Sequence, residues 1–592
     1  MSDSLYARVL AADPQRGLFL YEDFADTPTF ISYAELPARI AACAAHFRQQ
    51  GVQPGDRILF PFETSATLIV SFLGLLELGA VPLSVKPYIL STPKQAYQDF
   101  LLRIAERHRV SLFLDAPSLK SLELPLRRVP LPPAGARLET GGLRAPSPET
   151  LAFVQFSSGS TSHPKGVPVT WGALVANLRM FTTFHRFSSS DRGCTWLPLY
   201  HDMGLVASVL ACVYGGCDIH IAQPTSFLMN PVGWLEFMSK CRTTLTIIPN
   251  FAVDYLLKYL EAEELERLEL SALRCCGLGS EPINIPNLER FMALLAPRGL
   301  QRTAIRPSYG MAEAVVAVAC TGSQPLRVIT GPNGQQAISV GPPLSGFEVR
   351  LRSEDGRLCG ERELGEIELR GGSLAASYFE HERPLLGAEA FYSTGDLGFM
   401  DGGELFITGR VNDRIKINGQ SYFSSDFEQA IERLPFIRPG RTVVIQTQGR
   451  MVVLAELHSL AALEQRAQSQ QQVCAAIMQS VGVSVAPQDV LFIRYGQIQK
   501  TSSGKLRRRA MTEAYEQGRI RVSTPMGLRA DQLRMRGERL FYGSLIEARK
   551  RGSRWLESGR AVFDPVVQRV RAVLKPTTAP PSARGSGRTR PP

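Results

Sequence analysis

Short apolar runs alternate with longer segments of helical periodicity through the first part of the chain. This pattern predicts helices at residues 33–50, 65–78 and 97–108 and strands at 57–62, 81–85 and 110–114. It continues with strands at 194–199, 217–221, 244–248 and 274–278 and helices at 205–213 and 231–240. Alternation of this kind is typical of largely parallel sheets with helices on their faces. We therefore expect an α/β fold with a large N-terminal domain.

The pattern changes near residue 338, where short alternating strands such as 347–351 and 365–369 predict a small β subdomain. A shorter module follows, with the elements of an α+β domain: a helix at 424–434, strands at 441–446 and 452–456, and a helix at 463–481. The sequence thus predicts a large domain over 1–408, a small C-terminal domain over 409–523 and an extension over 524–592.

One polar stretch stands out within the alternating part of the chain. An apolar run at 151–156 leads into it, and a segment of helical periodicity starts after it at Trp171. The stretch contains Ser157, Ser158, Gly159, Ser160, Thr161 and Lys165. Hydroxyl donors, a lysine and a glycine that lets the backbone approach closely are suited to holding a polyphosphate. We predict a strand, a phosphate loop and a helix, with a Ser/Gly surface turn as the alternative; the Walker A order does not occur.

Five further motifs follow in order. They are Leu197-Pro-Leu-Tyr-His-Asp-Met-Gly204, Ser308-Tyr-Gly-Met-Ala-Glu313, Ser393-Thr-Gly-Asp396, Gly409-Arg-Val-Asn-Asp-Arg-Ile-Lys416 and Lys500-Thr-Ser-Ser-Gly-Lys505. With the loop at 157–166, they resemble the motifs of the adenylate-forming superfamily, over about residues 15–520. Within it they most resemble the fatty-acyl-AMP ligases, which activate a fatty acid with ATP and pass the acyl group to an acyl carrier protein.

The resemblance implies where ATP would bind. It places the adenine against Gly279, Ser280, Glu281, Tyr309, Gly310 and Met311, with Tyr309 stacked on the base. Asp396 would accept hydrogen bonds from both ribose hydroxyls, because a carboxylate matches a vicinal diol, and Arg410 would lie on the same side. A core tyrosine and a simple turn are the alternatives for Tyr309 and Asp396.

The resemblance also implies the catalytic residues. Lys505 would bridge the substrate carboxylate and the α-phosphate, because joining two anions requires a cation. Glu313 and Thr161 would hold Mg²⁺. His201 would lie near the reacting carboxylate, and Asn412 would be the hinge of a mobile C-terminal domain. The alternatives are that Lys505 is a solvated lysine in a basic run, that His201 is a structural histidine, and that Asn412 is an ordinary loop asparagine.

The sequence gives weaker evidence for the substrate and for the thiol that accepts its acyl group. The aspartate with which amino-acid-activating relatives pair the substrate amine is absent, which favours an uncharged acyl chain in an apolar tunnel, where each buried CH₂ contributes ~0.8 kcal/mol. Fatty-acyl-AMP ligases carry a longer insertion near 314–341 than this chain does, so free coenzyme A is the alternative acceptor. Ser162 replaces a glycine usual in the family, and a non-catalytic nucleotide-binding protein is the alternative of another class.

Composition adds limits. The 592 residues are 44% hydrophobic and 20% charged, as in ordinary globular proteins. Ten scattered cysteines and a start without a secretory signal lead us to expect reduced thiols in a cytoplasmic protein.

Most of the net charge of +11 falls in 525–592, with 15 Lys plus Arg against 5 Asp plus Glu. Within this extension, residues 566–575 predict a basic amphipathic helix that could bind an acidic carrier protein or an anionic membrane surface. The alternative is a helix packed against the enzyme itself. The extension has few aromatic residues among its arginines, which disfavours nucleic-acid binding.

Overall fold

The computed structural model describes residues 4–89, 92–133, 135–136, 143, 146–156, 165–381, 384–387, 389–417, 420–500 and 505–532. The chain forms two compact units, one ending at Ser523 and the other starting at Thr524. In the second unit, residues 525–532 are helical, and the Thr524 hydroxyl caps them by accepting from the Gly527 N–H at 3.1 Å. The basic helix predicted at 566–575 lies outside the described residues.

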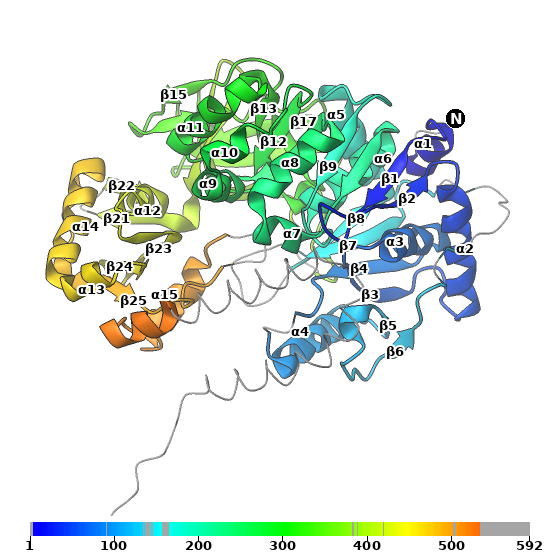
Figure 1. Ribbon diagram of the computed structural model, residues 1–592, viewed down its shortest axis with the longest axis horizontal. Coiled ribbons are helices and arrows are strands. Elements are labelled where there is room, and N and C mark those ends of the chain that lie inside the picture. The colour runs from blue at the N-terminus through cyan, green and yellow to red at the C-terminus, as the bar shows by residue number, and fades with distance from the viewer. Residues whose placement is uncertain are drawn as a thin grey trace, which may run out of the picture. The chain divides into compact units, whose positions relative to one another are not determined.

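A six-stranded sheet starts the first unit (Figure 1). Its strands in spatial order are β6 (Arg127–Val129), β5 (Leu112–Leu114), β3 (Arg57–Pro61), β4 (Val81–Val85), β7 (Leu151–Phe156) and β8 (Gly166–Thr170). All neighbours are parallel except β7 and β8, which are antiparallel. The helices in this region are α1 (Leu5–Ala11), α2 (Leu36–Gln49), α3 (Ala66–Leu78), α4 (Lys94–Arg107) and α5 (Trp171–Phe184).

An eight-stranded sheet forms the second layer of strands. Its order is β14 (Ala317–Cys320), β13 (Ile305–Gly310), β12 (Cys275–Gly279), β11 (Leu245–Pro249), β9 (Arg192–Thr195), β10 (Asp218–Ile221), β1 (Gly17–Leu20) and β2 (Thr29–Ser32). Only the edge strands β14 and β2 are antiparallel to their neighbours. The associated helices are α6 (Ala211–Gly215), α7 (Pro224–Met229), α8 (Pro231–Cys241), α9 (Asn250–Tyr259), α10 (Ala262–Leu265) and α11 (Ile285–Leu295).

One hydrophobic core joins the two sheets. It contains Ile58 and Phe153 of the first sheet, Ile219 of the second, and most of α3. Helix α3 is apolar on almost every side, and the Ser65 hydroxyl caps it by accepting from the Leu68 N–H at 3.2 Å. A helix that is apolar all round is stable only when buried, so α3 is an interior helix.

The remaining strands are mostly antiparallel, as the short alternating runs predict. One sheet contains β17 (Phe347–Arg352), β18 (Gly365–Gly371), β19 (Tyr392–Asp401) and β20 (Glu404–Arg410), and β15 (Val328–Thr330) pairs with β16 (Gln336–Ile338). The C-terminal module follows with β21 (Arg414–Ile417), β22 (Gln420–Phe423), α12 (Ser424–Glu432), β23 (Ile437–Thr447), β24 (Arg450–Leu457), α13 (Leu460–Glu464), α14 (Arg466–Val481), β25 (Val490–Ile493) and α15 (Arg508–Glu516). The expected α/β fold is confirmed; the domain limits and the mobility of the module remain predictions.

The element that follows the phosphate loop differs from the expectation. Helix α5 does begin at Trp171, but β8 precedes it and pairs with β7 in an antiparallel register that places Gly166 opposite Phe156. The loop therefore connects two strands, not a strand and a helix. The prediction gave residues 166–170 no element of their own between the loop and the helix, because five residues are too few for periodicity to identify a strand.

Two predicted elements beside the second sheet also differ. The strand expected at 194–199 ends at Thr195. The helix expected at 205–213 begins earlier, as a wide π-type helix over Met203–Leu210 that continues into α6. Gly204 allows this helix to pack on the preceding turn, because a Cβ there would lie 2.3 Å from the Pro198 carbonyl oxygen. Helices of this type are frequent near functional sites, and this one follows His201 and Asp202 directly.

Candidate active site

Tyr309, Asp396 and Arg410 form one cluster, which we call the ribose side. Tyr309 lies at the end of β13, and Asp396 and Arg410 are paired residues on β19 and β20. The Tyr309 hydroxyl donates to Asp396 Oδ2 at 2.7 Å, and Arg410 Nε lies 2.7 Å from Asp396 Oδ1. Burial, and then the negative charge of Asp396, raises the pKa of Tyr309, so its hydroxyl remains a donor.

Glycine is required next to Tyr309. A Cβ on Gly310 would lie 1.7 Å from the Val316 carbonyl oxygen, at a register shift between β13 and β14. Val315 then has a φ of +71°, which is costly for a β-branched residue. Glu313 lies in the short turn between these positions, so the backbone around it is tightly constrained.

Glu313, Tyr378 and Lys165 form a second cluster, which we call the phosphate side. The Tyr378 hydroxyl donates to Glu313 Oε1 at 2.8 Å. Lys165 Nζ lies 4.5 Å from the centre of the Tyr378 ring, in cation–π contact. A carboxylate and an ammonium group are thereby held on the same aromatic side chain.

Lys505, from the C-terminal module, lies among carboxylates of the large domain. Burial, and then the positive charge of Arg410, lowers the pKa of Lys505, whereas Asp202, Asp396 and Glu281 act to raise it. Lys505 is thus close enough to these groups to interact with each of them electrostatically.

His201 lies within electrostatic range of Lys505. Burial, and then the charge of Lys505, lowers the pKa of His201 to about 4, so the imidazole is neutral at neutral pH. Its Nε2 is buried and has no hydrogen-bond partner among the described residues. A buried polar atom without a partner is costly, which suggests that a ligand satisfies it.

The predicted adenine-binding turn follows β12. Ser280 has a φ of +76°, and a Cβ on Gly279 would lie 2.8 Å from the Ser308 carbonyl oxygen. Glu281 Oε2 accepts a hydrogen bond from the Phe251 N–H at 3.0 Å, which ties this turn to α9. Met311 packs against the core of the β subdomain.

Several predicted residues are not brought into these clusters. Ser157, Ser158, Gly159, Ser160 and Thr161 lie outside the described residues, so their phosphate and metal roles remain predictions. Asn412 lies in a short turn, Val411–Asp413, that directly follows β20. This position connects the β subdomain to the C-terminal module, and the hinge role remains a prediction.

Sequence reasoning missed Tyr378, Tyr392 and Asp202 as site residues. Asp202 follows His201 within a motif that had been recognised, and Tyr392 directly precedes the Ser-Thr-Gly-Asp motif. Position within or directly beside a motif was therefore an available signal for both. No sequence signal marks Tyr378, because it is a single aromatic residue in a loop outside the motifs.

The residues at the phosphate side fit Mg²⁺. Over the described ranges of the chain, no group of three or more His, Cys, Asp or Glu side chains is arranged to hold a metal ion. Mg²⁺ in nucleotide sites needs no such group, since it takes one or two carboxylates and completes its shell with phosphate oxygens and water. Glu313 supplies a hard oxygen ligand, and the bond from Tyr378 leaves it further acceptor capacity.

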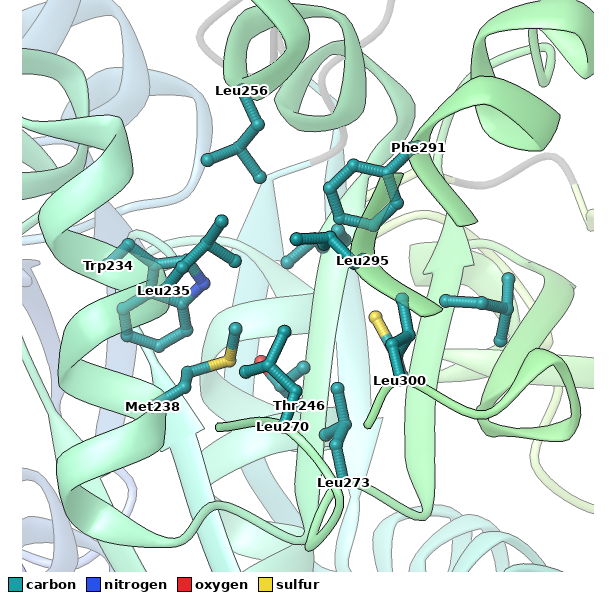
Figure 2. A pocket seen from close by; sticks show the side chains of 13 residues that line it. Trp234, Leu235, Met238, Thr246, Leu256, Leu270, Leu273, Phe291, Leu295 and Leu300 are labelled. Carbon is teal, nitrogen blue, oxygen red and sulfur yellow. The ribbon is translucent and has the colours of Figure 1, made fainter. Parts of the chain in front are cut away.

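A cavity in the second sheet's core is too small for a substrate. It has a volume of about 10 Å³ and lies among side chains of α8, β11, β12 and α11, including Trp234, Ile248, Cys276 and Phe291. Figure 2 shows apolar side chains surrounding it. Such a volume is about that of one water position, so this is a packed core and the predicted acyl tunnel remains a prediction.

The fold and site together define the class of protein. Motif residues lie at the ends of β12, β13 and β20 and beside β8. They include two carboxylates, Asp396 and Glu313, each hydrogen-bonded by a tyrosine, and the buried lysine Lys505. This is an α/β fold of the adenylate-forming ligase class.

Comparisons with known proteins assign the family. A family model described as AMP-binding enzyme matches residues 8–379, and one described as Disco-interacting protein 2-like, AMP domain, matches 412–524. The chain belongs to the AMP-binding enzyme family.

Its relatives include ligases with different acceptors. The chain is 31% identical over 424 residues to the medium-chain-fatty-acid–[acyl-carrier-protein] ligase JamA of Moorena producens, covering 64% of this chain and 71% of JamA. It is 29% identical over 545 residues to a putative acyl-CoA synthetase of Caulobacter vibrioides, covering 86% and 94%. A structure from a study of fatty acyl-adenylate ligases from E. coli and L. pneumophila superposes with a TM-score of 0.80 at 25% identity, covering 87% and 98%.

Two further observations concern the whole described chain. All ten cysteines fall within it, and none is in a disulfide. Among its helices, not one combines the length and apolar character needed to cross a bilayer.

Proposed function

We propose that this protein uses ATP to convert a fatty acid to acyl-AMP, and then transfers the acyl group to the phosphopantetheine thiol of an acyl carrier protein. The observation that carries the proposal is the position of Lys505. It is buried and within electrostatic range of Arg410, Asp202, Asp396 and Glu281, where the substrate carboxylate and the α-phosphate would meet.

In the first step, a carboxylate oxygen of the fatty acid attacks the α-phosphorus of ATP. The bond from that phosphorus to the oxygen shared with the β-phosphate breaks, and pyrophosphate leaves. Lys505 reduces the repulsion between the two anions and stabilises the charge that develops on the α-phosphate. Asp396, with Tyr309 and Arg410, orients the ribose. Lys165, in contact with Tyr378, would face the leaving phosphates. Bound at Glu313, Mg²⁺ would neutralise phosphate charge.

His201 suits the approach of the fatty acid. Because its pKa is about 4, the imidazole is neutral and does not trap the carboxylate in an ion pair away from the phosphorus. Its buried Nε2 is available to the reacting carboxyl group. His201 would therefore orient the carboxylate, while Lys505 supplies the positive charge.

In the second step, the thiolate sulfur attacks the acyl carbonyl carbon, the carbon–oxygen bond to AMP breaks, and AMP leaves. Lys505 belongs to the module that follows Asn412, so rotation there would withdraw the lysine and clear a path for the thiol.

Free coenzyme A is a second candidate acceptor. JamA supports the carrier, and the Caulobacter relative supports coenzyme A. The segment from 314 to 341 favours coenzyme A, because it contains only β14 and the small β15–β16 hairpin.

A product assay tests the proposal. The protein is supplied with Mg²⁺-ATP and fatty acids of increasing length, and acyl-AMP is measured alone, with coenzyme A, and with a phosphopantetheinylated carrier protein. We expect acyl-AMP to persist with coenzyme A and to be consumed by the carrier. Rapid formation of acyl-CoA would show that coenzyme A, and not a carrier protein, is the acceptor. Binding of ATP without formation of acyl-AMP from any acid would favour the non-catalytic alternative.

A further inference from the structure

A short segment around Tyr378 connects the two edges of the phosphate side. The Ala375 N–H donates to the Glu313 carbonyl oxygen at 2.8 Å, and the Phe379 N–H donates to the Gly166 carbonyl oxygen at 2.8 Å. The five residues 375–379 thus join the turn that carries Glu313 to the strand that follows Lys165. Tyr378 lies between these two attachments.

The Tyr378 side chain makes two different contacts and has a third neighbour in electrostatic range. Its hydroxyl donates to Glu313 Oε1 at 2.8 Å, and its ring faces Lys165 Nζ at 4.5 Å from the ring centre. Tyr392, which directly precedes the motif that contains Asp396, interacts electrostatically with Tyr378. One phenol therefore links residues of two separate motifs and interacts with a residue beside a third.

The Tyr378 hydroxyl is the donor in its bond to Glu313, because a carboxylate oxygen can only accept. A donor fixed on one carboxylate oxygen restricts the rotation of the carboxylate and orients its remaining lone pairs.

We propose that Tyr378 is a positioning residue for the metal-bound phosphates of ATP, because it orients the Glu313 carboxylate through its hydroxyl and the Lys165 ammonium through its ring. This inference rests on the proposed use of Mg²⁺-ATP. The two effects can be tested independently, because the hydroxyl orients the Glu313 carboxylate and the ring orients the Lys165 ammonium.

Tyr378→Phe tests the hydroxyl. Loss of a group that orients a metal ligand typically costs about 10–100-fold in metal affinity. We expect the Mg²⁺ concentration that half-saturates binding of α,β-methylene-ATP, measured by calorimetry, to rise about tenfold, with affinity recovered at high Mg²⁺. Acyl-AMP formation should show the same recovery. An unchanged Mg²⁺ dependence would overturn the role of the hydroxyl.

Tyr378→Leu tests the ring. It removes both the hydroxyl and the aromatic face below Lys165, so we expect a further loss of about fivefold in nucleotide affinity that high Mg²⁺ does not recover. Equal affinities of the Phe and Leu variants at saturating Mg²⁺ would overturn the role of the ring. The pair thus divides the proposal into two measurable parts.

Tyr33→Phe is the matched control. Its hydroxyl is also buried and donates to the Cys217 carbonyl oxygen at 2.7 Å, in the core away from the clusters. This variant should lower thermal stability without changing the Mg²⁺ dependence. If Tyr378→Phe behaves in the same way, its role is structural only.

The binding measurement also separates this inference from the proposed function. Wild-type protein that binds the analogue with Mg²⁺ but makes no acyl-AMP would contradict the proposed reaction and leave the Tyr378 test intact. Wild-type protein whose analogue binding needs no divalent ion would overturn the inference, whatever the reaction.

Discussion

The ribose side and the phosphate side hold their carboxylates differently. Both oxygens of Asp396 are engaged by protein groups, Tyr309 and Arg410, each at 2.7 Å, and its side chain is only 8% exposed. Glu313 accepts from one phenol, at Oε1. The Asp396 carboxylate is therefore fixed by its protein partners, whereas the Glu313 carboxylate retains acceptor capacity for a cation.

The backbone elements that carry the residues of the two sides also differ in rigidity. Asp396 and Arg410 are paired across two neighbouring strands of one sheet, β19 and β20. Glu313 lies in a short turn, and Lys165 directly precedes β8. Strands hold side chains more rigidly than turns do, so we expect the phosphate side to depend more on its ligands.

Removal of Lys505 should have the largest effect, because this residue interacts with Asp396 and Arg410 of the ribose side and also with Asp202. Lys505→Ala should lower the single-turnover rate of acyl-AMP formation about 10³-fold. Thioester formation from supplied acyl-AMP should be retained if the lysine acts in the first step alone.

Arg509→Ala is the control for that experiment. Its side chain is 71% exposed and pairs with Glu513 at 3.2 Å on α15, close to Lys505 in the sequence. This variant should keep its adenylation rate. A loss of less than tenfold in Lys505→Ala would contradict the assignment of Lys505.

Charge removal on each side should distinguish the two carboxylates directly. Glu313→Gln and Asp396→Asn should each lower kcat/KM for ATP by about 10²-fold, the cost of a hydrogen-bonded charge. Only Glu313→Gln should also change the Mg²⁺ concentration needed for half-maximal rate. Matching Mg²⁺ profiles in a steady-state titration of both variants would refute the distinction between the two sides.

A pH profile should give the smallest effect. Lys505 acts as a cation and its pKa is lowered in the free protein, so kcat/KM should fall as pH rises, starting below the ordinary lysine value of about 10.4. Bound carboxylate and phosphate favour the charged form, so kcat should fall at a higher pH. Because the pKa of His201 is about 4, this histidine should give no acid limb between about pH 5 and 8.

Rate measurements between about pH 5 and 10 test both limbs. Lys505→Arg keeps the charge and should move the basic limb of kcat/KM beyond this range, even if the rate is lower. A basic limb that is identical in wild type and Lys505→Arg would belong to another group.

Much of the fold was predictable because its signals are local. Helix α3 and strands β3 and β4 lie where apolar runs and caps place them, and the site residues Tyr309, Asp396 and Lys505 occur within recognisable motifs. Strand β8 was missed because five apolar residues before a helix carry no distinct period. Tyr378 was missed because its role depends on contacts with Glu313 and Lys165, which lie 65 and 213 positions away in the sequence.

The sequence by itself determined the class of chemistry, since it specifies the order of strands and the motifs that follow them. Only the tertiary structure decided which motif residues share a site and what protonation state they have. Antiparallel pairing placed Arg410 beside Asp396, and burial near Lys505 lowered the pKa of His201. Distances and desolvation arise from packing between segments far apart in the chain, and local sequence patterns contain no record of either.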